Sequence, residues 1–175
     1  MNQHIQELAR KLATAYSCLE HVRAVALGGS HASGMAPDAI SDLDLYVYRD
    51  GELSMSGRRR IASDHSTEIE VGNTYWEDGD EWIAREPTVR VDVTFRHVPW
   101  IEGELERVLG RHEPRLGYST CILYSIQNCV MLHDRSVLAA IPLGGAEAVG
   151  EVTRLLDSLD SWLRTLGLLP AFPVR

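Results

Sequence analysis

Residues 22–34 read VRAVALGGSHASG and join a short apolar strand to a glycine-rich turn. The apolar run over 22–27 is typical of a buried strand, and Gly28-Gly29 ends it, because glycine takes backbone conformations that other residues avoid. The small residues from Ser30 onward are compatible with the start of a helix, whose first N–H groups could bind an anion. Such a stretch more often marks a simple turn, so it predicts a phosphate site only together with other features.

A pair of aspartates follows this turn in the stretch Ser41-Asp42-Leu43-Asp44-Leu45. Alternate residues of a strand lie on one face, so we expect Asp42 and Asp44 side by side, where their charges repel unless a cation lies between them. Asp92 lies in a second strand of alternating pattern, over 89–95. Each part alone also fits outward-facing strand residues. Together, three carboxylates from two strands beside a phosphate-binding turn would form an oxygen-rich site for Mg²⁺.

The periodicity of the chain predicts an alternation of helices and strands. Helices are predicted over 3–20, 30–35, 54–65, 100–109 and 151–169, strands over 22–27, 43–48, 68–71 and 89–95, and a helix followed by a short strand over 119–132. The polar, acidic residues 72–87 are predicted to form a loop. This order indicates an α/β (α+β) fold with a small mixed β-sheet of about four to five strands flanked by helices. The main domain would cover 1–140, followed by a linker and a C-terminal helix over 141–175.

The charge of the chain restricts its function and is unevenly distributed. The 175 residues include 17 Lys and Arg against 25 Asp and Glu, a formal net charge of −8. This balance argues against a protein whose main task is to bind a nucleic-acid backbone. Residues 64–86, here called the acidic window, hold eight acids and one arginine. The window is either a solvated loop or a surface for a cationic acceptor, in which Glu68 and Glu70 share a strand face and would approach Asp92 if their strands are neighbours.

Several features predict a cytoplasmic protein. The cysteines Cys18, Cys121 and Cys129 form no C-x-x-C pair and lie among apolar neighbours, as expected for reduced, mostly buried thiols. The first residues are too polar for a secretory signal, and no apolar run approaches the ~20 residues that span a bilayer. Arg58-Arg59-Arg60 could reach a triphosphate or a partner, but we favour a solvated face of the predicted helix over 54–65.

Three motifs together resemble those of nucleotidyltransferases of the polymerase-beta-like superfamily: Gly29-Ser30-x-x-x-Gly34, Ser41-Asp42-x-Asp44-Leu45, and Asp92. Their order, separation and strand context match, and the resemblance covers residues 20–100. It is nearest to the branch that modifies antibiotics, the lincosamide and aminoglycoside nucleotidyltransferases. Residues 117–135 look like the helix and short strand with which that branch ends.

The resemblance implies a transferase that moves a nucleoside monophosphate from a nucleoside triphosphate to a hydroxyl of a small-molecule acceptor, such as an antibiotic, and releases pyrophosphate. The triphosphate would be ATP or another nucleoside triphosphate. Two Mg²⁺ ions would be held by Asp42, Asp44 and Asp92. Asp92 would also help to deprotonate the acceptor hydroxyl.

The same resemblance assigns the triphosphate to Gly29, Ser30 and Gly34, through N–H and hydroxyl contacts. His31 stands where many relatives carry Arg or Lys. Relatives of the antibiotic type continue into a helical C-terminal domain that shapes the acceptor pocket, whereas only the helix over 151–169 is available here. The short chain leaves open a minimal enzyme, a site completed in a homodimer, a shortened relative of weak activity, or an antitoxin-like module that binds or nucleotidylates a partner protein.

Overall fold

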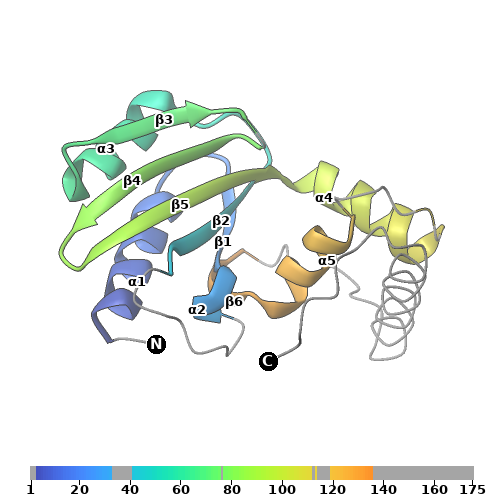
Figure 1. Cartoon of the computed structure of the whole chain (residues 1–175). Coiled ribbons are helices and arrows are strands. Elements are labelled where there is room, and N and C mark those ends of the chain that lie inside the picture. The colour runs from blue at the N-terminus through green and yellow to red at the C-terminus, as the bar shows by residue number, and fades with distance from the viewer. Residues whose placement is uncertain (1–2, 33–40, 76, 112, 114–118, 136–175) are drawn as a thin grey trace, which may run out of the picture. The chain divides into compact units, whose positions relative to one another are not determined.

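The computed structural model describes residues 3–32, 41–75, 77–111, 113 and 119–135 (Figure 1). All of them belong to one unit of the chain, Met1–Ile141. Six strands form one mixed sheet in the order β3-β4-β5-β2-β1-β6. The strands are β1 Val22–Leu27, β2 Leu43–Arg49, β3 Ile69–Asn73, β4 Gly79–Arg85, β5 Thr88–His97 and β6 Val130–Asp134. The predicted linker and C-terminal helix over 141–175 lie outside the described residues.

Helices accompany the sheet, so the mixed α/β class is confirmed. In the described ranges they are α1 Gln3–Ser17, α2 Gly29–Ala32, α3 Met55–His65, α4 Val98–Leu105 and α5 Ser119–Asn128, with a π-helical segment, η1 Glu106–Gly110, continuing α4. The predicted helix and short strand over 119–132 are confirmed as α5 and β6. Within these ranges no helix is long and apolar enough to cross a membrane.

The central strands β2 and β5 pair in parallel, whereas every other neighbouring pair of the described sheet is antiparallel. The alternation in β2 buries Leu43, Leu45 and Val47 on one face and leaves Asp44 and Tyr46 half-buried on the other. The apolar face packs against α1 and α3 to form the core (Figure 1). Each fully buried aliphatic side chain contributes about 1.5–3 kcal/mol relative to exposure, which fixes the register of β2.

The predicted loop over 72–87 is wrong, because these residues include β4, which lies between β3 and β5. The strand buries Trp82 and Ala84 towards the helices, but the third residue on that face is Asp80, which is 1% exposed. A carboxylate at a core position hides the alternation that would otherwise predict a strand. With β4 and β6 included, the sheet has six strands rather than four to five.

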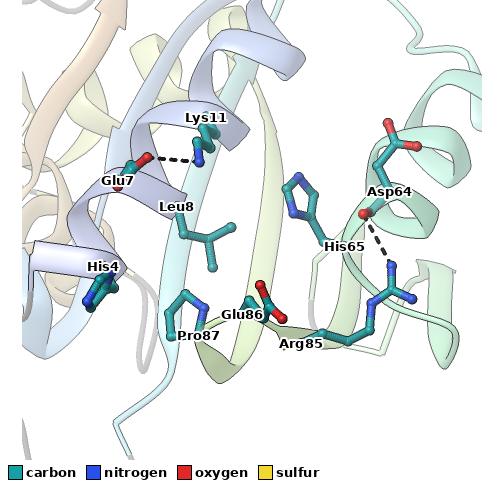
Figure 2. A pocket seen from close by; sticks show the side chains of 9 residues that line it. All are labelled: His4, Glu7, Leu8, Lys11, Asp64, His65, Arg85, Glu86 and Pro87. Atoms are coloured by element: carbon teal, nitrogen blue, oxygen red, sulfur yellow. Dashed lines mark hydrogen bonds and ion pairs between the residues drawn. The ribbon is translucent and has the colours of Figure 1, made fainter.

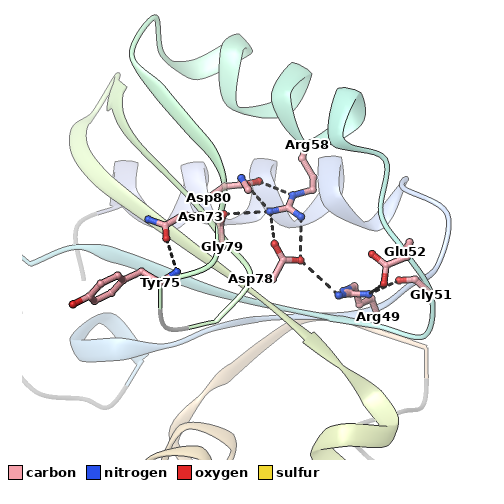
Figure 3. Close-up of polar contacts among 10 residues, drawn as sticks. Arg49, Gly51, Glu52, Arg58, Asn73, Tyr75, Asp78, Gly79 and Asp80 are labelled. Carbon is pink, nitrogen blue, oxygen red and sulfur yellow. Dashed lines mark hydrogen bonds and ion pairs between the residues drawn. The ribbon is translucent and has the colours of Figure 1, made fainter.

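The predicted solvated face of α3 is wrong for Arg58, which is 3% exposed, although Arg59 and Arg60 are exposed. Arg58 donates through Nε and Nη2 to the Asp80 carboxylate, at 3.1 and 2.6 Å. It also donates through Nη1 and Nη2 to the Asp78 carboxylate, at 3.1 and 2.9 Å (Figure 3). We call Arg58, Asp78 and Asp80 the Arg58 cluster. The cluster fastens α3 to the start of β4.

The cysteine prediction is only partly right. Cys18 is exposed at the end of α1, contrary to the expectation of a buried thiol. Cys129 is half-buried between α5 and β6, and burial raises the pKa of its thiol. A raised pKa keeps the thiol protonated at neutral pH, so Cys129 is a poor nucleophile.

Candidate active site

The face of the sheet opposite α1 and α3 carries carboxylates on four neighbouring strands. Asp44 of β2 pairs with Asp92 of β5, Asp92 with Glu81 of β4, and Glu81 with Glu70 of β3. Residues directly opposite each other on neighbouring strands share a face of the sheet. We call Asp44, Asp92, Glu81 and Glu70 the carboxylate row. Asp42 precedes β2 next to the first member of the row.

The glycine-rich turn meets the row at Asp44. The Gly28 N–H donates to the Asp44 carbonyl at 2.9 Å, and Gly29 begins α2 with φ +59°. A Cβ added at Gly29 would clash with Oδ2 of Asp44, so only glycine brings the backbone this close to the carboxylate. Ser30 follows, half-buried, in α2. The structure therefore brings the predicted triphosphate turn to the predicted metal-binding aspartates, while Gly34 lies outside the described residues.

His31 provides a second contact between the glycine-rich turn and the stretch that holds Asp42 and Asp44. Its ring is buried, and Nε2 lies 3.4 Å from the carbonyl oxygen of Ser41, the residue before Asp42. An arginine or lysine at this position would supply a positive charge beside the predicted triphosphate turn. His31 instead packs α2 against the start of β2.

The carboxylates of the row repel one another. The pKa of Asp44 is raised from 3.8 to about 6, first by burial and then by the charges of Asp92 and Asp42. The pKa of Asp92 is also raised, by burial and then by the charges of Glu81 and Asp42, although Arg90 acts in the opposite direction. Because like charges disfavour ionisation, a cation placed between Asp44 and Asp92 would be stabilised by both.

The donor set at this point fits Mg²⁺. In the part of the chain that the structure describes, no three His, Cys, Asp or Glu side chains are assembled into a metal site. Mg²⁺ does not need such a cage, since it keeps several waters and is usually bound by one or two carboxylates together with substrate phosphates. Asp44 and Asp92 supply two carboxylates at paired positions, and Asp42 lies beside them. All three offer hard oxygen ligands next to the Gly29 turn.

A cavity of about 290 Å³ adjoins the row on the side of β4. Its walls come from the end of β3, the β3–β4 connection, β4 and β5: Asn73, Tyr75, Glu77, Gly79, Asp80, Glu81, Asp92 and Thr94. The volume is at the lower end of the range for small-molecule sites. Asp92 and Glu81 belong to both the row and the cavity, so the cavity opens beside the predicted metal-binding aspartates.

Arginines from outside the acidic window neutralise much of it. Arg96 donates from Nε and Nη2 to the two carboxylate oxygens of Glu77, at 3.0 Å each. Arg90 pairs with Glu81, and Arg58 pairs with Asp78 and Asp80. Four of the eight acids therefore form ion pairs that hold the β3–β4 hairpin against β5 and α3. The window is neither a plain solvated loop nor an uncompensated anionic surface.

The structure places Glu68 and Glu70 away from the cavity. The expectation that they approach Asp92 required β3 and β5 to be neighbours, but β4 lies between them. Glu70 is exposed at the far end of the row, and Glu68 is exposed before β3. Glu77 and Glu81 line the cavity instead. The alternation of residues 79–85 could have identified Glu81 as a neighbour of Asp92, had Asp80 not obscured it.

A larger cavity of about 930 Å³ lies between α1, the end of α3 and the β4–β5 turn (Figure 2). Polar side chains dominate its lining, with Lys11 paired to Glu7 at 2.9 Å and Arg85 directed at the Asp64 carbonyl at 3.4 Å. None of the residues proposed for metal or triphosphate lines it. The α1 and α3 side of the sheet is therefore not the face of the candidate active site.

The raised pKa of Asp44 predicts a pH dependence of stability. The folded chain holds the Asp44 proton more tightly than the unfolded chain, so this group favours folding increasingly as the pH falls from about 6 to about 4. Asp44→Asn lacks the repulsion, so we expect it to be more stable than the parent at pH 7.5 by about 1–2 kcal/mol, with screening allowed for. At pH 4.5 the gap between the two proteins should shrink to about a third of its value at pH 7.5, and below pH 3.8 it should nearly vanish. Urea unfolding of both at four pH values measures the gap, and a gap independent of pH would contradict the assignment.

No known protein-family model matches the chain, and no curated protein matches it either.

Proposed function

We propose that this protein is a metal-dependent nucleotidyltransferase. It would transfer a nucleoside monophosphate from a nucleoside triphosphate, with ATP as the first choice, to a hydroxyl of a small-molecule acceptor and release pyrophosphate. The observation that carries the proposal is the pairing of Asp44 with Asp92 directly beside the Gly29 turn. This arrangement combines oxygen ligands for a divalent cation with backbone N–H groups for a phosphate.

The roles of the turn follow from its contact with Asp44. Gly29 and Ser30 would bind the triphosphate through N–H and hydroxyl groups. Since Gly29 has no Cβ, phosphate oxygens bound there would lie close enough to share a cation with Asp44. Mg²⁺, when bound, supplies charge neutralisation for the phosphates and for the pyrophosphate that leaves. The protein contributes mainly alignment and electrostatics.

Asp92 would act on the acceptor side, since it faces both Asp44 and the cavity of about 290 Å³. The acceptor oxygen attacks the α-phosphorus, the bond from that phosphorus to the bridging oxygen of pyrophosphate breaks, and the hydroxyl proton passes to Asp92. Asp92 lies at the wall of the cavity, which places its carboxylate where it could accept a proton from a bound hydroxyl, as a general base requires. Glu81, next to Asp92, would form the wall against which the acceptor lies.

The direct test is label transfer. We expect the protein with MgCl₂ and an α-³²P-labelled triphosphate to label one member of a panel of hydroxylated acceptors, with stoichiometric pyrophosphate. The panel should include lincosamides, aminoglycosides and any partner protein that co-purifies. Chelation by EDTA should abolish transfer, and Asp92→Asn should lower kcat by about 10²–10⁴-fold. Absence of pyrophosphate release with every triphosphate and acceptor would refute the proposal.

Gly29→Ala should disrupt triphosphate binding, because the added Cβ overlaps the Asp44 carboxylate and φ +59° is strained for alanine. We expect a loss of transfer of about 10²-fold or more, together with weaker triphosphate binding by calorimetry. Gly103→Ala is the matched control, since nothing lies within 4 Å of a Cβ there. Alanine within α4 should leave activity intact and stabilise the helix by up to about 1 kcal/mol. Equal behaviour of the two variants would show that the turn does not hold the triphosphate.

A further inference from the structure

Arg90 places a guanidinium within the carboxylate row. It lies on β5 two residues before Asp92, so both side chains project from the same face of the sheet. Its Nη1 pairs with Oε1 of Glu81, and its Nε lies 4.0 Å from Oδ1 of Asp42. Arg90 therefore joins a cavity-lining carboxylate to one of the proposed metal ligands, on the same face of β5 as Asp92.

The contacts of Arg90 differ from those of the two buried arginines. Arg58 and Arg96 are 3% and 6% exposed and make fork-like pairs with carboxylates. Arg90 is 51% exposed, and its contact with Asp42 is long. Exposed pairs of this kind are weak and adjustable, because water can replace either partner. Arg90 can therefore move away from Asp42 without leaving either charge buried and unpaired.

We propose that Arg90 is the internal counter-cation of the carboxylate row in the metal-free protein, and that a divalent cation displaces it from Asp42. This inference rests on the proposed function, which assigns Asp42 to the metal. The guanidinium offsets the repulsion among Asp42, Asp92 and Glu81, and it opposes the approach of a second cation. Metal binding is then weak until the phosphates of a triphosphate add their own negative charge. Arg90 is thus a positioning residue that couples metal binding to the triphosphate.

The test is titration of the full chain with Mn²⁺ alone, followed by electron paramagnetic resonance of the free ion. We expect Arg90→Gln to bind Mn²⁺ about tenfold more tightly than the parent, because a competing positive charge is removed. Arg90→Lys should stay within about twofold of the parent, since it keeps the charge. Arg60→Gln is the matched control for net charge, because Arg60 is exposed on α3, on the other layer of the fold.

A second measurement uses the parent protein and so does not depend on any variant. In ¹H–¹⁵N spectra of the arginine Nε–H groups, the Arg90 signal should shift on addition of Mg²⁺, while those of Arg58 and Arg96 stay in place. Equal or weaker Mn²⁺ binding by folded Arg90→Gln, or an unmoved Arg90 signal at saturating Mg²⁺, would overturn the inference and leave the metal site standing. Absence of Mn²⁺ binding by the parent even with a triphosphate would instead overturn the proposed function.

Discussion

Asp44→Asn is expected to abolish nucleotidyl transfer while making the metal-free protein more stable at neutral pH. The substitution removes a proposed metal ligand and leaves Asp92 without its partner carboxylate on β2. We therefore expect kcat to fall by at least about 10³-fold. It also removes the repulsion that raises the pKa of Asp44 to about 6, so the melting temperature should rise. Opposite signs for activity and stability are expected of a residue kept for function rather than for folding.

Label transfer with MgCl₂ measures the first effect, and thermal unfolding at pH 7.5 in EDTA measures the second. Asp64→Asn provides the control, since Asp64 is exposed at the end of α3 on the layer opposite the carboxylate row. It should leave both transfer and melting temperature close to those of the parent. If Asp44→Asn transfers as well as the parent, the catalytic role of the row is wrong. If it is inactive but less stable, Asp44 is a structural residue instead.

Arg58→Met should lower the free energy of unfolding by about 3–5 kcal/mol. The substitution leaves Asp80, which is 1% exposed, without its guanidinium partner in the protein interior. Asp78 loses two hydrogen bonds from the same group (Figure 3). Removing one member of a buried pair costs far more than the pair contributes, because the remaining charge is left desolvated. The wall of the cavity should therefore loosen first, since the cluster holds the β3–β4 hairpin in place.

Urea unfolding followed by circular dichroism measures this loss. Arg59→Met is the matched control: Arg59 is the next residue of α3, is exposed, and should change stability by less than about 0.5 kcal/mol. Equal effects of the two substitutions would show that the Arg58 cluster contributes little. A second comparison, hydrogen exchange of the β4 amides, should show faster exchange in Arg58→Met than in Arg59→Met.

Local patterns were enough to predict the central elements of the fold. The apolar run before Gly28 and the alternation around Asp44 and Asp92 identify β1, β2 and β5, because one buried face imposes a period of two on each strand. They also indicated that the glycine turn and the aspartates belong together. The pairing of Asp44 with Asp92 is not encoded locally, since it depends on the parallel register of two strands separated by two others in the chain.

The interactions that escaped prediction join residues far apart in the sequence. Asp80 puts a charged residue at a buried position of β4, so the sequence pattern does not indicate a strand. The charge is tolerated there because Arg58, 22 residues earlier, pairs with it, and a local pattern cannot reveal such a pair. The same holds for Glu77, whose partner Arg96 lies 19 residues later. An acidic stretch is therefore interpreted as a solvated loop when the arginines that pair with it are not known. These ion pairs, together with the β4–β5 ladder, hold the hairpin that forms a wall of the cavity beside Asp92.

Stoichiometric binding of Mn²⁺ in the presence of a non-hydrolysable triphosphate tests the central claim most directly. Electron paramagnetic resonance of the parent should show two Mn²⁺ ions per chain that bind much more tightly with the triphosphate than without it. Both should be weakened by at least about tenfold in Asp44→Asn and in Asp92→Asn, while Asp64→Asn binds as the parent does. Mn²⁺ binding that is unchanged by either substitution, or triphosphate binding without any metal, would contradict the claim that Asp44 and Asp92 form the catalytic metal site.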